Sequence, residues 1–413
     1  MAEHCVLVLG FGMHGRVAIE DLEQSTDITH IIAADKETST ISRCLASIGA
    51  RKTSVRQIDA HDTGQLQSLM GEGASVVISL LPPAFDPTVA RLAIETGSHL
   101  VTANYGHDLR DLDKPAAERS ITIMPESGFD PGIDLVIARR LVDEFDEVDT
   151  LNSYGTGLPA PECKNANVIN YKISWSFIGA LRVYRRPARF LQDGQEEVVP
   201  GEDILRRPWV HTVEVGRLGR FEAFPNGDVV PILEALGIRH SVKESARYTL
   251  RWPGSCEFWS KISALGLLDD VPVPGTAMSP REFLDRHLAP RLQYGPSERD
   301  MAILRVDAAG TRNGRRMGRR FELIGYRDLA TGVLAMNRLV GYPVSIVAQM
   351  ILAGTITRRG VGSPARDIPP APFFESLAAR NIDITEQDID PAECCVRHDA
   401  GEQDGPPPRP ATR

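Results

Sequence analysis

Three glycines near the start of the chain constrain its fold more than any other feature. Gly10, Gly12 and Gly15 form a G-x-G-x-x-G pattern that directly follows an apolar run at residues 5–9 and precedes a helical pattern at 16–22. In this strand–turn–helix context the first glycine permits a tight turn, the second lets a pyrophosphate approach the backbone, and the third lets helix and strand pack closely. The pattern predicts a dinucleotide site, and a glycine-rich turn with a purely structural role is the alternative.

The acid that follows the second apolar run bears on the choice of cofactor. Residues 30–34 are apolar and end in Asp35, which lies 20 residues after Gly15, the spacing expected of a carboxylate that binds ribose hydroxyls. Because this carboxylate would repel a 2′-phosphate, we expect NAD(H) to be favoured over NADP(H), although Lys36 beside it weakens the argument. The predicted cofactor-binding residues are Gly10, Phe11, Gly12, Met13, His14, Gly15, Asp35, Lys36, Leu80, Leu81, Pro82 and Asn104.

The following segments continue the alternation of strand and helix. Apolar runs at 76–81, 99–102 and 121–124 are typical of buried parallel strands, and the proline-rich segment 81–87 cannot continue a strand. We therefore expect an α/β fold with a Rossmann-type, doubly wound parallel sheet, and a loop at 81–87 over the nicotinamide half of the cofactor. Ligands bind at the carboxyl ends of the strands in such sheets, where the loops that carry Asn104, Tyr105 and Asp130 would gather.

The stretch 126–134 marks the end of the nucleotide-binding pattern. Asp130 precedes Pro131, so the sequence predicts an Asp130 N-cap and a helix that begins at Pro131. Gly128 and Gly132 permit backbone shapes that a side chain would block. Asp130 is thus either a cap alone or a site residue as well.

Length and charge restrict the class of protein. The chain has 413 residues, which favours two domains, and 46 Lys plus Arg against 55 Asp plus Glu give a net charge of −9. This balance argues against nucleic acid or an anionic membrane as the main partner. The six cysteines and ten histidines show no metal spacing, so we expect free thiols, no metal and a cytoplasmic location, with no apolar run that could span a bilayer.

An arginine-rich segment at 310–320 needs a separate interpretation. Asn313 and Gly314 separate two apolar strand patterns, which predicts a hairpin turn with solvated arginines rather than a nucleic-acid patch. The proline-rich end of the chain predicts a disordered tail, which we place at 391–413.

Several motifs together resemble the saccharopine reductase family (saccharopine dehydrogenase, glutamate-forming), over the chain to about residue 360. They are the glycine pattern at 10–15 and the segments 126–134, 153–162, 171–176, 249–254, 321–324, 331–336 and 341–343. The resemblance implies a Rossmann domain at 1–130, an α/β substrate and dimerisation domain at 131–340 with a helical insertion near 265–292, and a return to the Rossmann domain at 341–390. It also implies a homodimer.

The resemblance further implies a chemistry and a set of site residues. Family members transfer a hydride between a nicotinamide cofactor and a carbon that bears nitrogen, through an imine that water opens to an aldehyde and an amine. Tyr105 and Asp130 match the catalytic, substrate-proximal positions, and Arg251 matches an arginine expected to hold a carboxylate of a small amino-acid-derived substrate. Further substrate-binding candidates are Asn226, Trp175, Lys172, Gly155 and Thr156.

Two departures from the family pattern bear on the substrate. Gly155 stands where the family commonly has a cysteine, and Ile178 stands where fungal members carry an arginine. The pocket therefore lacks a thiol and a cation, which argues against direct transfer of substrate identity. Two other functions stay open: an amine transferase or lyase with NAD as a prosthetic group, as in the related homospermidine synthases, and a dinucleotide-binding protein without activity.

Overall fold

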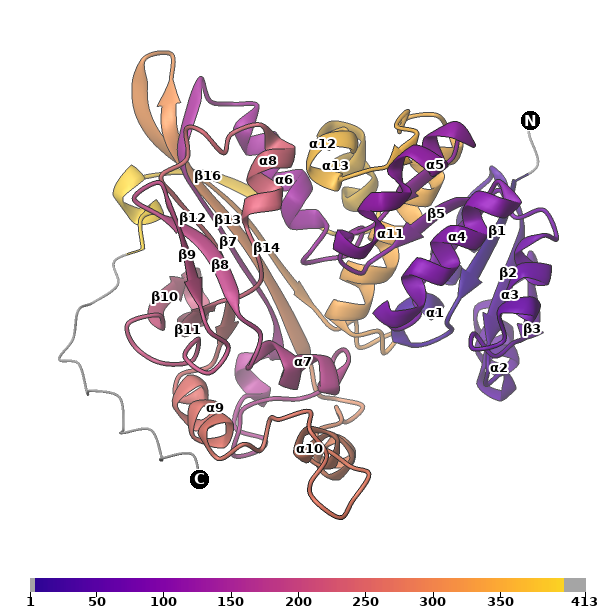
Figure 1. The fold of residues 1–413 in the computed structure, drawn as a ribbon, viewed down its shortest axis with the longest axis horizontal. Coiled ribbons are helices and arrows are strands. Elements are labelled where there is room, and N and C mark those ends of the chain that lie inside the picture. The colour runs from indigo at the N-terminus through magenta and orange to yellow at the C-terminus, as the bar shows by residue number, and fades with distance from the viewer. Residues whose placement is uncertain (1–3, 397–413) are drawn as a thin grey trace.

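The computed structural model describes residues 4–396 and builds two domains, each on one β-sheet (Figure 1). The first sheet has seven strands in the order β15-β6-β5-β4-β1-β2-β3, and every pairing within it is parallel. This confirms the predicted doubly wound parallel sheet. Its strands are β1 (His4–Leu9), β2 (Ile28–Asp35), β3 (Thr53–Gln57), β4 (Val76–Ser79), β5 (His99–Thr102), β6 (Thr122–Met124) and β15 (Gly360–Val361).

Side chains of β1 alternate between two hydrophobic cores, as the two-residue repeat of a strand requires. Leu7 and Leu9 belong to a core on one face of the sheet, whereas Val6 and Val8 belong to a larger core that continues into the second domain. Helices of the first domain are α1 (Met13–Gln24), α2 (Ser39–Ile48), α3 (Thr63–Met70), α4 (Asp86–Thr96) and α5 (Asp113–Glu118).

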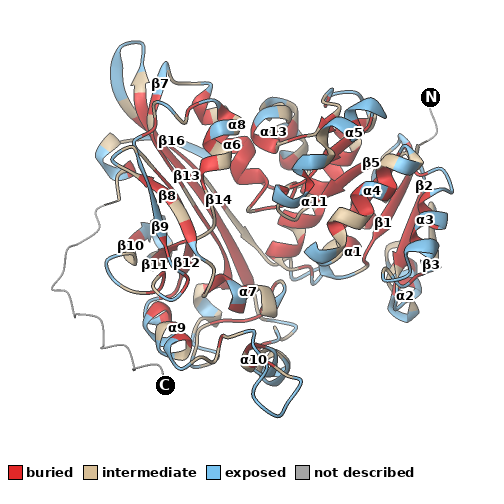
Figure 2. Cartoon of the chain, viewed as in Figure 1, coloured by how far each residue is buried: buried red, intermediate tan, exposed pale blue. Residues whose placement is uncertain are grey.

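The second sheet is mixed and larger. Its order is β10-β11-β12-β7-β13-β14-β16, with β8 paired to β12 and to β9, and β12 runs parallel to β7 while the other pairs are antiparallel. Its strands are β7 (Glu147–Pro159), β8 (Ala188–Gln192), β9 (Gln195–Val199), β10 (His211–Val215), β11 (Gly219–Pro225), β12 (Glu244–Arg251), β13 (Asp300–Arg312), β14 (Arg315–Tyr326) and β16 (Thr385–Ile389). In Figure 2 the central strands of both sheets, among them β1, β7 and β13, are mostly buried, whereas no residue of the outer strand β3 is buried and the outer strands β9 and β16 are largely exposed.

Helices of the second half cover this sheet and its rim. They are α6 (Ile133–Val142), α7 (Phe177–Val183), α8 (Val230–Leu236), α9 (Ser255–Ala264), α10 (Pro280–Leu288), α11 (Ala335–Leu352), α12 (Pro364–Asp367) and α13 (Pro370–Ala378). Short 3-10 turns are η1 (Pro83–Phe85), η2 (His107–Leu112), η3 (Pro161–Cys163), η4 (Gly216–Leu218), η5 (Ala289–Arg291) and η6 (Pro391–Cys394). Within the predicted insertion at 265–292, only α10 and η5 are helical.

Helix α11 connects the two domains, because it packs against α1, β4 and β5 of the first and against β13 and β14 of the second. Gly341 makes the α1 contact possible, since a Cβ there would lie 2.6 Å from Val17 Cβ and 2.8 Å from His14 O. After α11 the chain adds β15 to the edge of the first sheet beside β6. The domain boundaries at 130/131 and 340/341 stay predictions.

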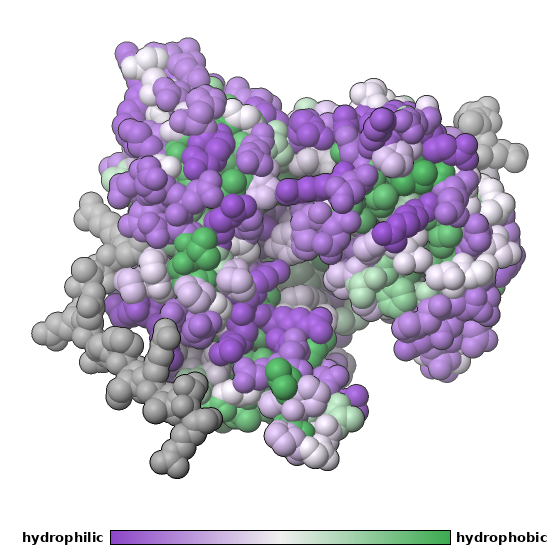
Figure 3. All heavy atoms as spheres, in the orientation of Figure 1, coloured by the Kyte–Doolittle hydropathy of each residue, from purple (hydrophilic) through white to green (hydrophobic). Residues whose placement is uncertain are grey.

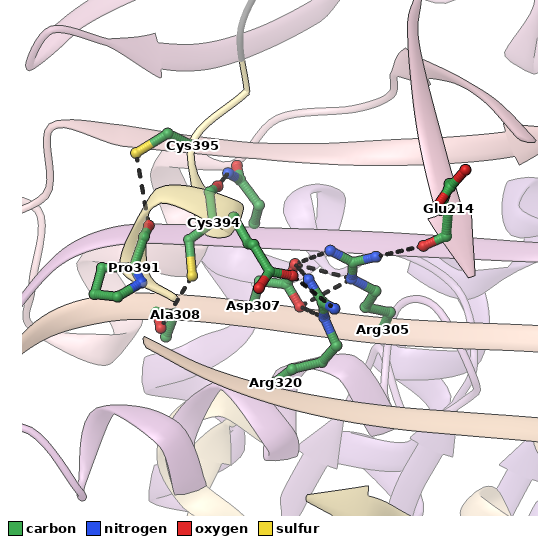
Figure 4. Close-up of polar contacts among 10 residues, drawn as sticks. Glu214, Arg305, Asp307, Ala308, Arg320, Pro391, Cys394 and Cys395 are labelled. Atoms are coloured by element: carbon green, nitrogen blue, oxygen red, sulfur yellow. Dashed lines mark hydrogen bonds and ion pairs between the residues drawn. The ribbon is translucent and has the colours of Figure 1, made fainter. Parts of the chain in front are cut away.

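The arginine-rich segment is a hairpin, as predicted from Asn313 and Gly314, which both have positive φ and join β13 to β14. Arg312, Arg315 and Arg316 next to the turn are exposed as predicted, whereas Arg319 and Arg320 are not. Asp307 is fully buried and accepts hydrogen bonds from both Arg305 and Arg320, whose side chains are themselves buried (Figure 4). The ion pair between Asp307 and Arg320 therefore links β13 to the neighbouring strand β14.

The end of the described chain differs from the predicted tail. Residues 391–394 form η6, where Cys394 is buried with its Sγ 3.4 Å from Ala308 O, and Glu393 pairs with Arg320 (Figure 4). The prediction of disorder thus fails for 391–396, and residues 397–413 lie outside the described residues. All six cysteines are free thiols. The face in Figure 3 is largely hydrophilic, and none of the helices between residues 4 and 396 is long and apolar enough to cross a membrane.

The buried carboxylate of Asp307 gives a stability prediction. Asp307→Asn should lower the free energy of unfolding by about 3 kcal/mol, because it leaves two buried guanidinium groups without their shared counter-charge. Urea unfolding measures this change. Asp388→Asn is the matched control, since Asp388 pairs with Arg319 but is 75% exposed, and its loss should change little. Equal effects of the two substitutions would contradict the assignment.

Candidate active site

The glycine turn has the geometry of a phosphate cradle. Gly10 has a φ of +95°, and a Cβ there would lie 3.0 Å from Leu80 O, whereas a Cβ on Gly12 would meet no atom within 4 Å. A Cβ on Gly15 would overlap Gly10 O, so α1 can approach β1 only without a side chain there. Helix α1 starts directly at this turn, and no side chain caps its first amides. The open backbone at a helix N-terminus fits a pyrophosphate.

Asp35 lies beside this turn at the end of β2. Its Oδ2 accepts a hydrogen bond from the Phe11 amide at 2.7 Å, and its Oδ1 accepts one from the Glu37 amide at 3.0 Å. Lys36 is exposed next to it, and Met13 is 42% exposed at the start of α1. Both oxygens of Asp35 are thus engaged by the backbone, so this carboxylate fixes the shape of the loop.

The next loops of the same sheet edge are tied to one another. The Asn104 side-chain amide donates to Leu81 O at 3.1 Å, and the Asn104 carbonyl accepts from the Glu126 amide at 2.9 Å. Leu80, Leu81 and Pro82, which follow β4, therefore lie against the segment that carries Tyr105 and leads toward Asp130. This places the predicted cofactor residues and the predicted catalytic residues along one edge.

A guanidinium group from the second sheet completes the site. Arg247 on β12 is buried and pairs with Asp130, pairs with Asp134 at 2.8 Å, and donates to Tyr105 Oη at 3.0 Å. Gly155 on β7 leaves the room for this arrangement, because a Cβ there would overlap Asp130 Oδ2. The backbone amide of Asn226 donates a hydrogen bond to the backbone carbonyl of Arg247 at 2.8 Å. Four of the predicted residues are thus brought together around Arg247.

The prediction that Asp130 caps a helix beginning at Pro131 is wrong. Helix α6 begins at Ile133, and the amide of Gly132 donates to Asp134 Oδ1 at 2.7 Å. Gly132 is the N-cap residue and no side chain caps α6, so Asp134 only fixes the Gly132 amide just before the helix. The Asp130 carboxylate pairs with Arg247 instead of capping a helix.

The site contains more carboxyl groups than cations. Burial raises the pKa of Asp134 to about 7, opposed by the Gly132 amide. Burial also raises the pKa of Glu126, opposed by the Gly106 amide and by the charge of Arg247. Arg247 thus faces three carboxyl groups, of which Asp134 and Glu126 hold their protons more tightly than usual and so are less readily charged. Asp130, which pairs with Arg247, is the carboxylate of this group that suits a substrate nitrogen that is or becomes positively charged.

Tyr105, Glu126 and Arg247 of this cluster line a cleft of about 700 Å³ between the two domains, whereas Asp130 and the predicted cofactor residues lie outside its lining. Its walls include Tyr105, Glu126, Arg186, Gly227, Asp228 and Arg247. The volume is in the range of small-molecule sites. Within the described chain, no group of three or more His, Cys, Asp or Glu side chains is arranged to hold a metal ion.

The remaining predicted residues form a separate group that does not line this cleft. Arg251 is buried and donates to Tyr184 Oη at 2.8 Å and to Thr156 Oγ1 at 3.1 Å. Lys172 pairs with Glu298, and Trp175 is half-buried. Arg251, Thr156, Lys172 and Trp175 stay proposed substrate contacts, at one remove from Asp130.

Sequence reasoning missed Arg247, Asp134, Glu126 and Arg186. Arg247 could have been found from the sequence. It lies four residues before Arg251 in the same buried strand, so the two arginine side chains lie on the same face of that strand. Asp134 in a first helical turn was a second signal. No local pattern marks Arg186, which follows α7 in a loop.

Comparisons with known proteins identify relatives over both domains. Residues 6–124 match the family described as "Saccharopine dehydrogenase NADP binding domain", and residues 128–382 match "Saccharopine dehydrogenase C-terminal domain". The chain is 28% identical to the Saccharomyces cerevisiae "Saccharopine dehydrogenase [NADP(+), L-glutamate-forming]", covering 87% of this chain and 93% of that protein. It is 29% identical to the bovine mitochondrial alpha-aminoadipic semialdehyde synthase, covering 92% of this chain but 47% of that protein, so it spans about half the length of this relative.

Solved structures agree with this result. The apo saccharopine dehydrogenase (L-Glu forming) from Saccharomyces cerevisiae superposes with a TM-score of 0.81 at 25% identity, covering 94% of this chain and all of that chain. A homospermidine synthase from Legionella pneumophila in complex with NAD gives a TM-score of 0.61 at 10% identity, covering 94% and 92%. The second likeness shows the fold alone.

The prediction that NAD(H) is favoured over NADP(H) is wrong. The matching nucleotide domain is described as NADP binding, and the fungal relatives are named for NADP(+). The prediction rested on repulsion between the Asp35 carboxylate and a 2′-phosphate, and Lys36 was the residue that weakened it. Lys36 is exposed beside Asp35, whose oxygens accept hydrogen bonds from the Phe11 and Glu37 amides, so this segment offers a cation as well as an acid.

A buried acid near Asn104 gives a pH prediction. Burial raises the pKa of Asp86 from 3.8 to about 7, opposed by hydrogen bonds from Asn104 and Thr102. The folded protein therefore holds a proton that the unfolded chain releases, so the free energy of unfolding should fall as pH rises from about 4 to about 7. Asp86→Asn should flatten this fall in urea unfolding at several pH values. Asp111→Asn, at an exposed residue that does not contribute to the shift of Asp86, should leave it unchanged; an unaltered slope in Asp86→Asn would contradict the assignment.

Proposed function

Since the chain belongs to the saccharopine dehydrogenase family, we propose that it is an NADP(H)-dependent oxidoreductase that acts on saccharopine or a similar secondary amine. The fungal relatives are named for NADP(+) and for the formation of L-glutamate. The observation that carries the proposal is the cluster of Asp130, Tyr105 and Arg247 at the carboxyl edge of the nucleotide sheet, where Tyr105 and Arg247 line the cleft.

The proposed reaction begins at the carbon–nitrogen bond. Gly10 to Gly15 and the loops at Leu80 and Asn104 would hold the nicotinamide dinucleotide, which when bound would supply the acceptor for a hydride from this carbon. The electron pair on nitrogen then forms the C=N bond of an iminium ion. Water adds to this carbon, the carbon–nitrogen bond breaks, and an aldehyde and an amine leave, with one proton released. Atoms and electrons balance, since two electrons leave the substrate as the hydride.

The side chains of the cluster have distinct proposed tasks. The Asp130 carboxylate stabilises the positive charge that develops on nitrogen, and its position is held by Arg247. Tyr105 accepts a hydrogen bond from Arg247, so its own hydroxyl proton is directed to another acceptor, and the substrate is the acceptor we propose. Arg251 and Thr156 are proposed to contact a more distant part of the substrate.

The rival function is an amine transferase of the homospermidine synthase type. In that reaction the hydride returns to the substrate, so no reduced cofactor accumulates. Purified protein should be offered saccharopine with NADP(+) while the absorbance of reduced nicotinamide and the release of glutamate are followed. Equal amounts of NADPH and glutamate support the proposal. Amine exchange without free NADPH would support the transferase, and cofactor binding without turnover would support a protein that only binds dinucleotide.

A homodimer and a cytoplasmic location stay predictions for this chain. The bovine relative is named as mitochondrial. Sedimentation of the purified protein tests the dimer.

Asp130 gives the mechanistic prediction. Asp130→Asn should lower kcat roughly a hundredfold, because the group that offsets the charge on nitrogen is lost while the shape is kept. Affinity for NADP(+) should not change. The substitution removes no helix cap, because no side chain caps α6, so any fall in melting temperature measures the lost ion pair with Arg247. Steady-state kinetics and cofactor titration measure these effects. Normal turnover of Asp130→Asn would refute the role of Asp130.

A further inference from the structure

The cleft is lined by arginines whose charges are balanced unequally. Four of them pair with carboxylates: Arg189 with Asp228, Arg247 with Asp130 and Asp134, Arg358 with Asp113, and Arg366 with Asp367. A fifth, Arg110, is exposed. Arg186 is half-buried, and the partner of its side chain is the neutral amide oxygen of Asn226. No ion pair joins Arg186 to a carboxylate within residues 4–396.

The Arg186 guanidinium is nevertheless held in place. It lies over the ring of Tyr105, 5.4 Å from the centroid, and the Arg247 guanidinium lies 5.7 Å from the same centroid. Asn226 accepts a hydrogen bond from Nη2, while Nε is buried without a hydrogen-bond partner in the described chain. Arg186 lines the cleft, and a cation fixed against an aromatic ring without a carboxylate partner is pre-organised for an anion.

We propose that Arg186 binds the α-carboxylate of the amine half of the substrate and so selects an amino acid as the amine. The inference rests on the proposed function. The Asp130 carboxylate beside Arg247 suits a cationic nitrogen, and Arg186 presents a positive charge beside the same tyrosine ring. An α-amino acid carries its nitrogen and its carboxylate two bonds apart, so one molecule satisfies both charges. The planar fork of arginine pairs both carboxylate oxygens.

The proposal separates two classes of amine. A simple diamine has no carboxylate and would leave Arg186 uncompensated beside a bound ligand. Glutamate places its carboxylate there and removes that cost. Arg186 is thus a specificity residue for the amine, and Asp130 acts on the carbon–nitrogen bond itself.

The test uses the full chain in the reductive direction, with NADPH, the aldehyde and a varied amine. Arg186→Ala should raise the KM for glutamate about tenfold to a hundredfold, as expected for a charge-assisted contact, and should leave the KM for the aldehyde and for NADPH within about twofold. The preference for glutamate over 4-aminobutyrate, which lacks the α-carboxylate, should shrink by the same factor. Arg366→Ala, another arginine of the cleft wall with its own carboxylate partner, should behave as wild type.

A second variant and a binding measurement keep the outcomes distinct. Arg186→Lys keeps the charge without the fork, so its KM for glutamate should lie between those of wild type and Arg186→Ala, and it replaces the alanine variant if that one unfolds. Calorimetric titration of glutamate into the NADP-loaded protein should show the same order of affinities. If wild type binds glutamate through Arg186 but turns over nothing, the proposed function fails and this inference stands. If wild type turns over and Arg186→Ala keeps the wild-type KM and preference, the inference is overturned and the function stands.

Discussion

The buried guanidinium of Arg247 is the interaction on which the rest of the site depends. It extends from the second sheet and contacts Tyr105 in a loop of the first domain, Asp130 in the segment that leads out of that domain, and Asp134 in the first turn of α6. A buried charge of this kind is tolerated only with close counter-charges, and removal of one partner from such a group costs about 3–5 kcal/mol. The two domains therefore meet at the point where the proposed chemistry takes place, and the shape of the cleft depends on their contact.

Two glycines shape this arrangement because they have no side chain. Gly155 leaves space on β7 for the Asp130 carboxylate, and Gly341 leaves space on α11 for α1. The first absence shapes the site directly, and the second sets the approach of the helix that joins both sheets. A cysteine in place of Gly155 would force Asp130 away from its present position. The departure from the family pattern at this residue thus changes the position available to the carboxylate that we propose faces the substrate.

Local patterns predicted most of the fold. The glycine turn, the parallel strands and the hairpin at Asn313 depend on backbone preferences and on two-residue alternation, which a short window of sequence contains. The site was harder to predict, because Arg247 lies 117 residues from Asp130 in the sequence and no residue near Asp130 indicates the contact. The same limit explains one error, because Asp130 looked like a cap while its partner is remote. The error over the cofactor has another origin, because the spacing of Asp35 was given more weight than the cation of Lys36 beside it.

A double-mutant cycle on Asp130 and Arg247 tests most directly whether the two side chains act as one unit. The kcat for saccharopine oxidation would be measured for wild type, Asp130→Asn, Arg247→Gln and the double variant. If Arg247 positions Asp130, the two effects are not independent, and the double variant should be no slower than the slower single variant, within about threefold. If the two losses multiply, Asp130 and Arg247 act separately, and the central claim is wrong.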